Sequence, residues 1–484
     1  MKRIPGIIVT LLELFVAFSF IIFLFSTKMI PNKLLIAVAI GAFVITVIIF
    51  LLTMNSEKKI CFAIGVILIL LTTICYVVVG CYLRKGINTL SDITKPAVEK
   101  SGIAVYVRVS DQAEFLEDTK GYTYGILKVL DRENTDIVLE KMRKVIGNIE
   151  IKDYADVSEL VEGLEQEKEV DAIILNTGFM GLLEEQENYE AVKAQMKQIH
   201  VEKIEKKVTP KEETVKIPAI SSELPETFSV YISGIDSREG LIANSRSDVN
   251  IVATVNTVTH KVLLVSTPRD YFVPLSISNG VPDKLTHAGI YGIDVSKDTL
   301  AMLYQTDIDY YFRVNFGGFE QIIDSLGGIT IISDYTFDSQ NVKGYSFVQG
   351  ENQVNGQQAL AFARERYAFS EGDRQRGKNQ LHVIEGVIKK AMSPALLKNY
   401  SQTMETLAGS FETNVPYDVI AGLVRQQLNN GGQWTVESYS VDGSGSTEVP
   451  YSMNTTAYVM IPDMNTVNTA IEKMNQIKKG TIEK

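Results

Sequence analysis

Three long apolar runs near the N-terminus constrain the fold of this chain more than any other feature. Residues 7–25, 34–52 and 60–79 are almost wholly apolar, and each run has the roughly 20 residues that a helix needs to cross a bilayer. A cleaved signal peptide is the alternative for the first run, but two further runs follow and no small-residue cleavage site is evident. The sequence therefore predicts three transmembrane helices within residues 1–85, with the isolated Glu13 facing other helices because exposure to lipid would be costly.

Charge leaves the orientation of these spans open. Three spans place the N-terminus and the long C-terminal part on opposite sides of the membrane. The lysines and arginines that flank the spans are Lys2, Arg3, Lys58 and Lys59 on one side, and Lys28, Lys33, Arg84 and Lys85 on the other. The positive-inside rule therefore gives nearly a tie.

The chain is acidic, with a formal net charge of −11 over 484 residues. This balance argues against nucleic acid as a partner, because binding a phosphate backbone needs a basic surface. A direct transcription factor also conflicts with the three spans. All three cysteines, Cys61, Cys75 and Cys81, lie within or beside the third apolar run. The rest of the chain therefore has neither a disulfide framework nor a cysteine-containing zinc site.

Beyond the apolar runs the chain is predicted to be α/β. Strand-like, β-branched runs at residues 103–109 and 170–175 flank a segment with helical periodicity at 129–146. These patterns predict a small accessory α/β domain over residues 86–207. Its last part, residues 184–207, is highly charged and favours helix.

A linker and a larger domain follow. Residues 208–226 are rich in proline and charge, which is typical of a linker. From residue 227 to residue 484, strand-like runs alternate with helical segments, and this alternation predicts a domain of α-β-α layers.

Charged side chains follow or precede several of these strands. Asp236 comes after a strand and a glycine, Asp248 precedes the next strand, and Arg269 follows a third strand in a Pro-Arg-Asp turn. Ligand sites tend to lie at the strand ends of an α/β sheet. Each residue taken alone also suits a turn, a cap or an exposed ion pair. Together they indicate a ligand site only if these strand ends are adjacent.

Arg364 and Arg366 end a helix-like run. Residues two positions apart on a helix are rotated by about 200°, so these two arginines can serve one pocket only if the helix ends near Arg364. The segment up to Gly372 fits such a break. The alternative is that both arginines are solvated ends of an amphipathic helix.

A further helix is predicted from Asp373, as its cap, to about residue 392. On that helix Arg376 and Gln380 share a stripe with the apolar Val383 and Val387. Arg376 therefore points along the core side, where an arginine needs a counter-ion. Glu365, Glu371 or a bound phosphate could supply it, and an intramolecular salt bridge remains the alternative.

Together these residue types indicate a phosphate site. The planar, permanently charged fork of arginine suits phosphate oxygens, and paired aspartates suit a hard divalent cation that also holds substrate phosphates. Beside a bilayer, such a site suggests a phosphate-bearing lipid.

The order of these motifs resembles the LytR-CpsA-Psr family, over residues 228–390 most strongly. The motifs that carry the resemblance are Gly234-x-Asp236, Arg246-Ser-Asp248, Thr267-Pro-Arg-Asp270, Lys284-Leu-Thr-His-Ala288, Arg364-x-Arg366 and the run from Asp373 to Gln380. The three spans and the accessory domain make the chain most similar to the capsule-associated branch of the family.

The resemblance implies a multi-pass protein of the cell membrane with a large extracellular catalytic domain. That domain would bind a polyprenyl phosphate or pyrophosphate in a hydrophobic tunnel. It would transfer a glycopolymer, such as capsular polysaccharide or a related cell-wall polymer, from the lipid to peptidoglycan. Other capsule-assembly proteins are possible partners. A polyprenyl-phosphate-binding regulator of capsule synthesis and a lipid pyrophosphatase are the competing functions.

The resemblance also assigns roles by motif position. Asp236 and Asp248 would hold Mg²⁺ against the pyrophosphate, and one of them could act as a general base. Arg269 would lie nearest the bond that breaks. The remaining contacts to the head group would come from Arg246, Arg364, Arg366, Arg376 and Gln380.

Overall fold

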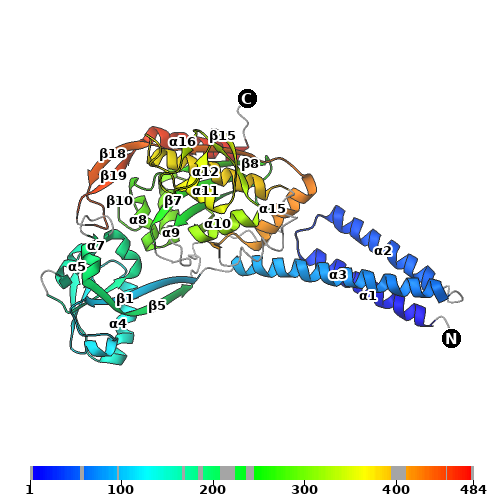
Figure 1. Cartoon of the computed structure of the whole chain (residues 1–484), viewed down its shortest axis with the longest axis horizontal. Coiled ribbons are helices and arrows are strands. Elements are labelled where there is room, and N and C mark those ends of the chain that lie inside the picture. Colours follow the sequence, from blue (N-terminus) through cyan, green and yellow to red (C-terminus); the bar gives the residue numbers. More distant parts are fainter. Residues whose placement is uncertain are drawn as a thin grey trace.

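The computed structural model describes residues 4–54, 59–94, 98–165, 169–183, 189–207, 224–235, 245–393, 410–453 and 455–480. Figure 1 shows three long helices on one side of a large α/β body and a smaller sheet domain on the other.

The three helices are α1 (Ile4–Ser26), α2 (Asn32–Met54) and α3 (Lys59–Ile93), and they pack on one another. Each is long and apolar enough to cross a membrane, judged by length and composition. Glu13 is fully buried and accepts a hydrogen bond from the Thr46 hydroxyl of α2. The prediction that this acid faces other helices is therefore confirmed.

The accessory domain is built on a five-stranded sheet of order β3-β2-β4-β1-β5. Its strands are β1 (Val98–Arg108), β2 (Thr123–Leu127), β3 (Glu150–Tyr154), β4 (Ala172–Asn176) and β5 (Met196–Lys207). Its helices are α4 (Arg132–Ile146), α5 (Val157–Glu165), α6 (Met180–Leu183), α7 (Tyr189–Gln195) and two 3-10 turns at Leu116–Thr119 and Thr177–Phe179. Apolar side chains bury both faces of this sheet.

The helix expected over residues 184–207 is wrong for its second half. Among the described residues of this segment, which begin at 189, only α7 is helical, and Met196–Lys207 forms the edge strand β5, antiparallel to β1. Ile204 of that strand is buried in the core of the accessory domain. Pairing with a distant strand outweighs the local helix preference of a lysine- and glutamate-rich segment.

The C-terminal domain contains a six-stranded sheet of order β16-β11-β6-β7-β8-β17. The strands are β6 (Thr227–Ile235), β7 (Ser247–Asn256), β8 (Lys261–Ser266), β11 (Tyr310–Asn315), β16 (Phe411–Thr413) and β17 (Thr435–Ser440). Four two-stranded sheets accompany it: β9 (Phe272–Pro274) with β10 (Pro282–Lys284), β12 (Ile329–Ser333) with β15 (Gly350–Val354), β13 (Phe337–Asp338) with β14 (Ser346–Phe347), and β18 (Gly443–Glu448) with β19 (Ala457–Pro462).

Helices cover both faces of the six-stranded sheet. The helices are α8 (Leu285–Ala288), η3 (Gly289–Tyr291), α9 (Ile293–Tyr304), α10 (Phe316–Ser325), α11 (Gly356–Arg364), α12 (Asp373–Ala391), α15 (Tyr417–Asn430) and α16 (Met464–Lys479). Tyr231 of β6 faces α9 and α16, whereas the neighbouring Val230 and Ile232 face α12 and α15. This alternation confirms the predicted α-β-α layering.

The sheet topology brings several strand ends to one edge. Strand β6 is parallel to β11, β8 is parallel to β17, and β7 is antiparallel to both β6 and β8. The C-terminal ends of β6, β8, β11 and β17 therefore meet where β7 begins. Residues at this edge come from distant parts of the sequence.

Contacts on two sides tie the C-terminal domain to the rest of the chain. Ile290 is buried in the apolar core of the accessory domain, and the adjacent Tyr291 ring lies 5.8 Å from the ring of Phe179. On the other side, Lys28 between α1 and α2 forms a 3.0 Å ion pair with Asp418 of α15. In a three-span topology, the connection between α1 and α2 lies on the same side of the membrane as the C-terminal end of α3. The ion pair between Lys28 and Asp418 requires this arrangement.

Candidate active site

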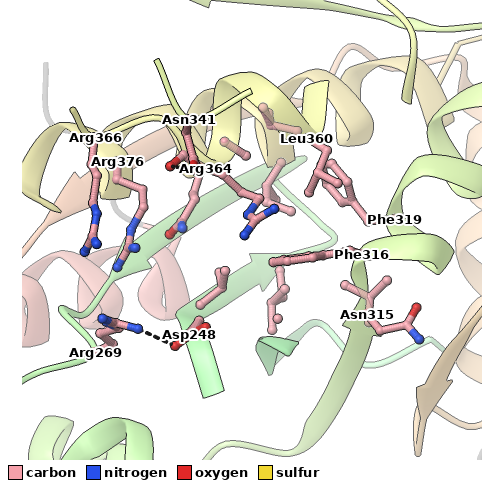
Figure 2. A pocket seen from close by; sticks show the side chains of 18 of the residues that line it. Asp248, Arg269, Asn315, Phe316, Phe319, Asn341, Leu360, Arg364, Arg366 and Arg376 are labelled. Atoms are coloured by element: carbon pink, nitrogen blue, oxygen red, sulfur yellow. Dashed lines mark hydrogen bonds and ion pairs between the residues drawn. The ribbon is translucent and has the colours of Figure 1, made fainter. Parts of the chain in front are cut away.

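A cavity of about 250 Å³ lies at the sheet edge described above, between the sheet and helices α10, α11 and α12. We call it the arginine cavity, because its walls hold four arginines and one aspartate. Figure 2 shows Arg269, Arg366 and Arg376 gathered near Asp248, whereas Phe316, Phe319 and Leu360 lie toward the other end. The cavity thus has a cationic end and an apolar end.

Arg269 is fixed by the tight turn that follows β8. Its Nη1 lies 2.8 Å from Oδ1 of Asp248, and its Nε lies 3.7 Å from Oδ2 of Asp270. Behind them, the buried Lys284 pairs with Asp270 at 2.9 Å. Burial opposes the charge of Arg269, but Asp248 and Asp270 outweigh it and raise its pKa. Positive and negative groups therefore alternate from Lys284 to Asp248 and hold the guanidinium at the cavity wall.

Arg364 and Arg366 reach the same cavity because α11 ends between them. Helix α11 ends at Arg364, so Arg366 lies on the segment that follows. The Arg364 guanidinium lies 4.3 Å from the centre of the Phe316 ring, a cation–π distance. Arg366 donates a 2.7 Å hydrogen bond to the Tyr367 hydroxyl and lowers the pKa of that phenol. The broken helix that the sequence required is present.

Glu365, between these two arginines, holds the surrounding backbone in place. Its carboxylate is fully buried and accepts hydrogen bonds from six donors of the neighbouring segments, namely the Ser339 hydroxyl and the backbone amides of Gln340, Asn341, Arg366, Tyr367 and Ala368. Burial raises the pKa of this carboxyl, but the donors outweigh burial and lower it overall. Glu365 is therefore a positioning residue for the arginines on either side.

Arg376 and Gln380 line the cavity from α12, together with Val383, as the predicted stripe requires. The side chain of Arg376 is 13% exposed and pairs with Asp373, one helical turn earlier. Burial lowers the pKa of Arg376, Asp373 opposes this effect, and Arg269 adds to it. A bound anion would offset the electrostatic cost of burying Arg376 and the repulsion between Arg376 and Arg269.

Neither of the two carboxylates expected to pair with Arg376 does so, whereas the alternative, an intramolecular salt bridge, is confirmed. Glu365 is occupied by backbone amides, as described above, and Glu371 pairs with Lys378 at 2.8 Å. Asp373 supplies the pairing instead, as the first residue of α12 rather than its cap, because Gly372 occupies the cap position. The i, i+3 spacing of Asp373 and Arg376 was the signal for this pair.

Asp248 is the carboxylate that lines the arginine cavity. Its predicted partner Asp236 lies outside the described residues. No cluster of three histidine, cysteine or acidic side chains suited to a metal occurs in the part of the chain that the structure describes. Mg²⁺ often binds through one or two carboxylates while substrate phosphates and water complete its shell. Asp248 beside a cationic pocket fits that mode of binding.

Arg246 is the predicted site residue that the structure places elsewhere. It is not among the residues that line the cavity. A Cβ added at Gly181 of α6 would lie 3.6 Å from its Nε, so Arg246 packs against the accessory domain. Its role toward the head group stays a prediction.

Three further polar residues line the cavity without having been predicted from sequence as site residues. They are Asn315, Asn341 and Tyr367. Asn315 caps α10 through a hydrogen bond from Gly318, and an asparagine before a Phe-Gly-Gly run could have signalled that cap. Asn341 enters from the loop that Glu365 organises, and no local sequence pattern indicates that long-range contact.

Comparison with known proteins places the site in a family context. The LytR_cpsA_psr family model matches residues 185–476. A protein from Bacillus licheniformis named polyisoprenyl-teichoic acid–peptidoglycan teichoic acid transferase TagU is 34% identical, over 41% of this chain and 64% of its own length. The protein of the same name from Bacillus subtilis is 31% identical, over 47% of this chain and 72% of its own length. The match thus spans just under two thirds of the first relative.

A solved structure, that of TagV from B. subtilis, is similar as well. It is 27% identical to this chain with a TM-score of 0.45, and the alignment covers 53% of this chain and 99% of TagV.

Proposed function

Because the chain belongs to the LytR_cpsA_psr family, we propose that it transfers a glycopolymer from a polyprenyl-pyrophosphate carrier to peptidoglycan. The observation that carries the proposal is the arginine cavity, which joins a cationic end to an apolar end. A lipid pyrophosphate has the same two parts. The arginines would contact its phosphates and the apolar walls its prenyl chain.

The polymer is the finer part of the proposal. The relatives from B. licheniformis and B. subtilis are named for teichoic acid. We propose capsular polysaccharide or a related cell-wall polymer, because the three spans and the accessory domain of this chain resemble the capsule-associated branch of the family. The teichoic acid in the names of the relatives does not conflict with this proposal. The arginine cavity would bind the linkage to the lipid, and that linkage does not depend on which polymer is attached.

The reaction is a phosphoryl transfer. A hydroxyl oxygen of the acceptor forms a bond to the phosphorus next to the polymer, and the bond from that phosphorus to the polyprenyl phosphate breaks. Negative charge grows on the departing phosphate, where Arg269 and Arg376 would stabilise it in a site sheltered from water. Asp248 would accept the hydroxyl proton, which would then pass to solvent.

Asp248 would hold Mg²⁺ in this proposal, with Asp236 as the second predicted ligand. When bound, the ion would neutralise charge on the pyrophosphate. The residues of the chain would still have to orient the donor and exclude water from its phosphates. Arg364 and Arg366 would do so from the α11 side of the cavity.

The apolar end of the cavity can be tested by filling it. Ala363 lines the arginine cavity from α11 and is 9% exposed. We expect Ala363→Phe to weaken binding of a long-chain polyprenyl pyrophosphate by about 10-fold, the effect of losing one or two buried methylenes. Binding of inorganic pyrophosphate, which has no chain, should stay within about 2-fold. Equal weakening of both ligands would place the lipid elsewhere.

The proposed location is the cell membrane, with the C-terminal domain extracellular. The contact of Lys28 with Asp418 sets that domain beside the membrane end of the helices, within reach of a lipid donor. We expect protease added to intact cells to cleave within residues 224–480 and to spare the connection between α2 and α3. Protection of the C-terminal domain until the membrane is permeabilised would overturn the extracellular orientation.

A lipid pyrophosphatase and a lipid-sensing regulator would use the same residues differently. The first would pass the phosphorus to water, and the second would bind the lipid without turnover. Incubation of the detergent-solubilised full chain with lipid-linked polymer, Mg²⁺ and peptidoglycan separates the three. Polymer attached to peptidoglycan supports the proposal, whereas free polymer or unreacted donor supports a competitor.

A further inference from the structure

A second cavity of about 290 Å³ adjoins the arginine cavity, and we call it the polar cavity. Asp248, Arg269, Arg376 and Gln380 line both cavities and so form a shared wall. The polar cavity extends from this wall past the ends of β8 and β17 to the first turn of α12. Whatever occupies it therefore meets the same charged groups as a pyrophosphate in the arginine cavity.

The polar cavity differs from the arginine cavity in charge. Its lining holds four acidic and four basic side chains, whereas the arginine cavity has four basic and one acidic. Several of these groups already pair, as Arg374 does with Asp442 at 2.7 Å and Lys378 with Glu371 at 2.8 Å. A balanced set of donors and acceptors suits a neutral ligand rich in hydroxyl groups, such as a sugar, better than a second anion.

The geometry of phosphoryl transfer indicates whether the donor or the acceptor would occupy the polar cavity. In phosphoryl transfer the attacking and leaving oxygens lie roughly in line with phosphorus. The leaving polyprenyl phosphate extends into the apolar end of the arginine cavity, so the attacking hydroxyl must approach from the opposite side of the shared wall. We infer that the polar cavity holds the acceptor sugar of peptidoglycan during transfer. This inference rests on the proposed function and adds to it the position of the second substrate.

The same position explains why Asp248 belongs to both cavities. A base must lie within hydrogen-bond reach of the hydroxyl that loses its proton. A hydroxyl entering through the polar cavity meets Asp248 on the shared wall, next to the guanidinium of Arg269. The donor and the acceptor then approach the same carboxylate from its two sides.

Gly377 allows the polar cavity to be filled without touching the arginine cavity. Gly377 lines the polar cavity and not the arginine cavity. A Cβ added to it would meet just the Ser266 hydroxyl, at 3.5 Å. A leucine in place of this helical glycine also favours helix, so Gly377→Leu should fold. Lys389→Leu is the matched control, because it adds a leucine to the exposed part of the same helix, where Lys389 is 57% exposed.

The experiment measures donor binding, acceptor binding and transfer by the full chain in detergent. For Gly377→Leu we expect at least a 10-fold rise in the KM for soluble peptidoglycan strands and a matching loss of direct strand binding. The Kd for sugar-bearing donor should stay within about 2-fold, and Gly377→Ala should change the KM less and in the same direction. Lys389→Leu should match the wild type.

Three results would overturn the inference. The first is that Gly377→Leu leaves the KM unchanged. The second is that Gly377→Leu binds peptidoglycan strands as tightly as the wild type does. The third is that Gly377→Leu loses affinity for sugar-bearing donor but not for bare polyprenyl pyrophosphate, which would assign the cavity to the donor sugar. The strand-binding measurement needs no turnover. If the wild type bound strands, Gly377→Leu did not, and the wild type never transferred polymer, the proposed function would fail. The sugar site would still be supported.

Discussion

Arg269→Ala is expected to reduce polymer transfer by about 10²–10³-fold, the usual effect of removing one preorganised donor from a developing negative charge. Arg269 lies on the wall shared by the arginine cavity and the polar cavity, and Asp248 and Asp270 hold its charge in place. The measurement is kcat/KM for transfer at saturating acceptor. Arg269→Lys should be intermediate, because a lysine keeps the charge but loses the two-pronged geometry.

Controls separate this effect from unfolding. Removing Arg269 leaves Asp248 without its ion pair, whereas Asp270 keeps Lys284, so we expect only a modest fall in the thermal midpoint. Arg143→Ala, at an exposed position of α4, should leave both the midpoint and the transfer rate unchanged. Transfer by Arg269→Ala at more than a tenth of the wild-type rate would remove this arginine from the chemistry.

Asp248→Asn is expected to reduce transfer by at least about 100-fold, while binding of polyprenyl pyrophosphate without Mg²⁺ stays the same or strengthens. The carboxylate is the single acidic group described in the arginine cavity, so its loss removes a repulsion toward phosphate and frees Arg269 from a competing partner. The Mg²⁺ concentration for half-maximal activity should rise, because a hard-oxygen ligand is lost. Lipid binding and a Mg²⁺ titration after chelation with EDTA measure the two effects.

This pattern distinguishes Asp248 from the arginines. Arg269→Ala should lose both binding and transfer, whereas Asp248→Asn should lose transfer alone. Asp136→Asn, at an exposed carboxylate of α4, provides the matched control. Weaker lipid binding by Asp248→Asn in the absence of Mg²⁺ would mean that this aspartate organises the pocket instead of serving the reaction.

Local sequence patterns predicted the parts of the molecule that depend on neighbours in the chain. The apolar runs predicted three helices, and the geometry of Arg364 and Arg366 required a helix end that the structure contains. The stripe from Arg376 to Val383 predicted which side of α12 faces the cavity. Each inference needed only helix periodicity and side-chain chemistry.

Features that depend on distant segments escaped prediction. Strand β5 has the composition of a helix and becomes a strand because β1 is available to pair with it. Asn341 reaches the cavity because Glu365 gathers the amides of another loop. Arg246 packs against Gly181 through the docking of two domains. In each case the deciding partner lies many residues away, where no spacing rule applies.

The central claim is that phosphorus passes from a lipid carrier to peptidoglycan, and an isotope placed on one phosphate tests it directly. The donor would carry the label on the phosphate next to the polymer and would react with the full chain, Mg²⁺ and peptidoglycan. We predict that the label appears in the new linkage between polymer and peptidoglycan, with unlabelled polyprenyl phosphate released. Label found only in free polymer, or only in intact donor, would contradict the account.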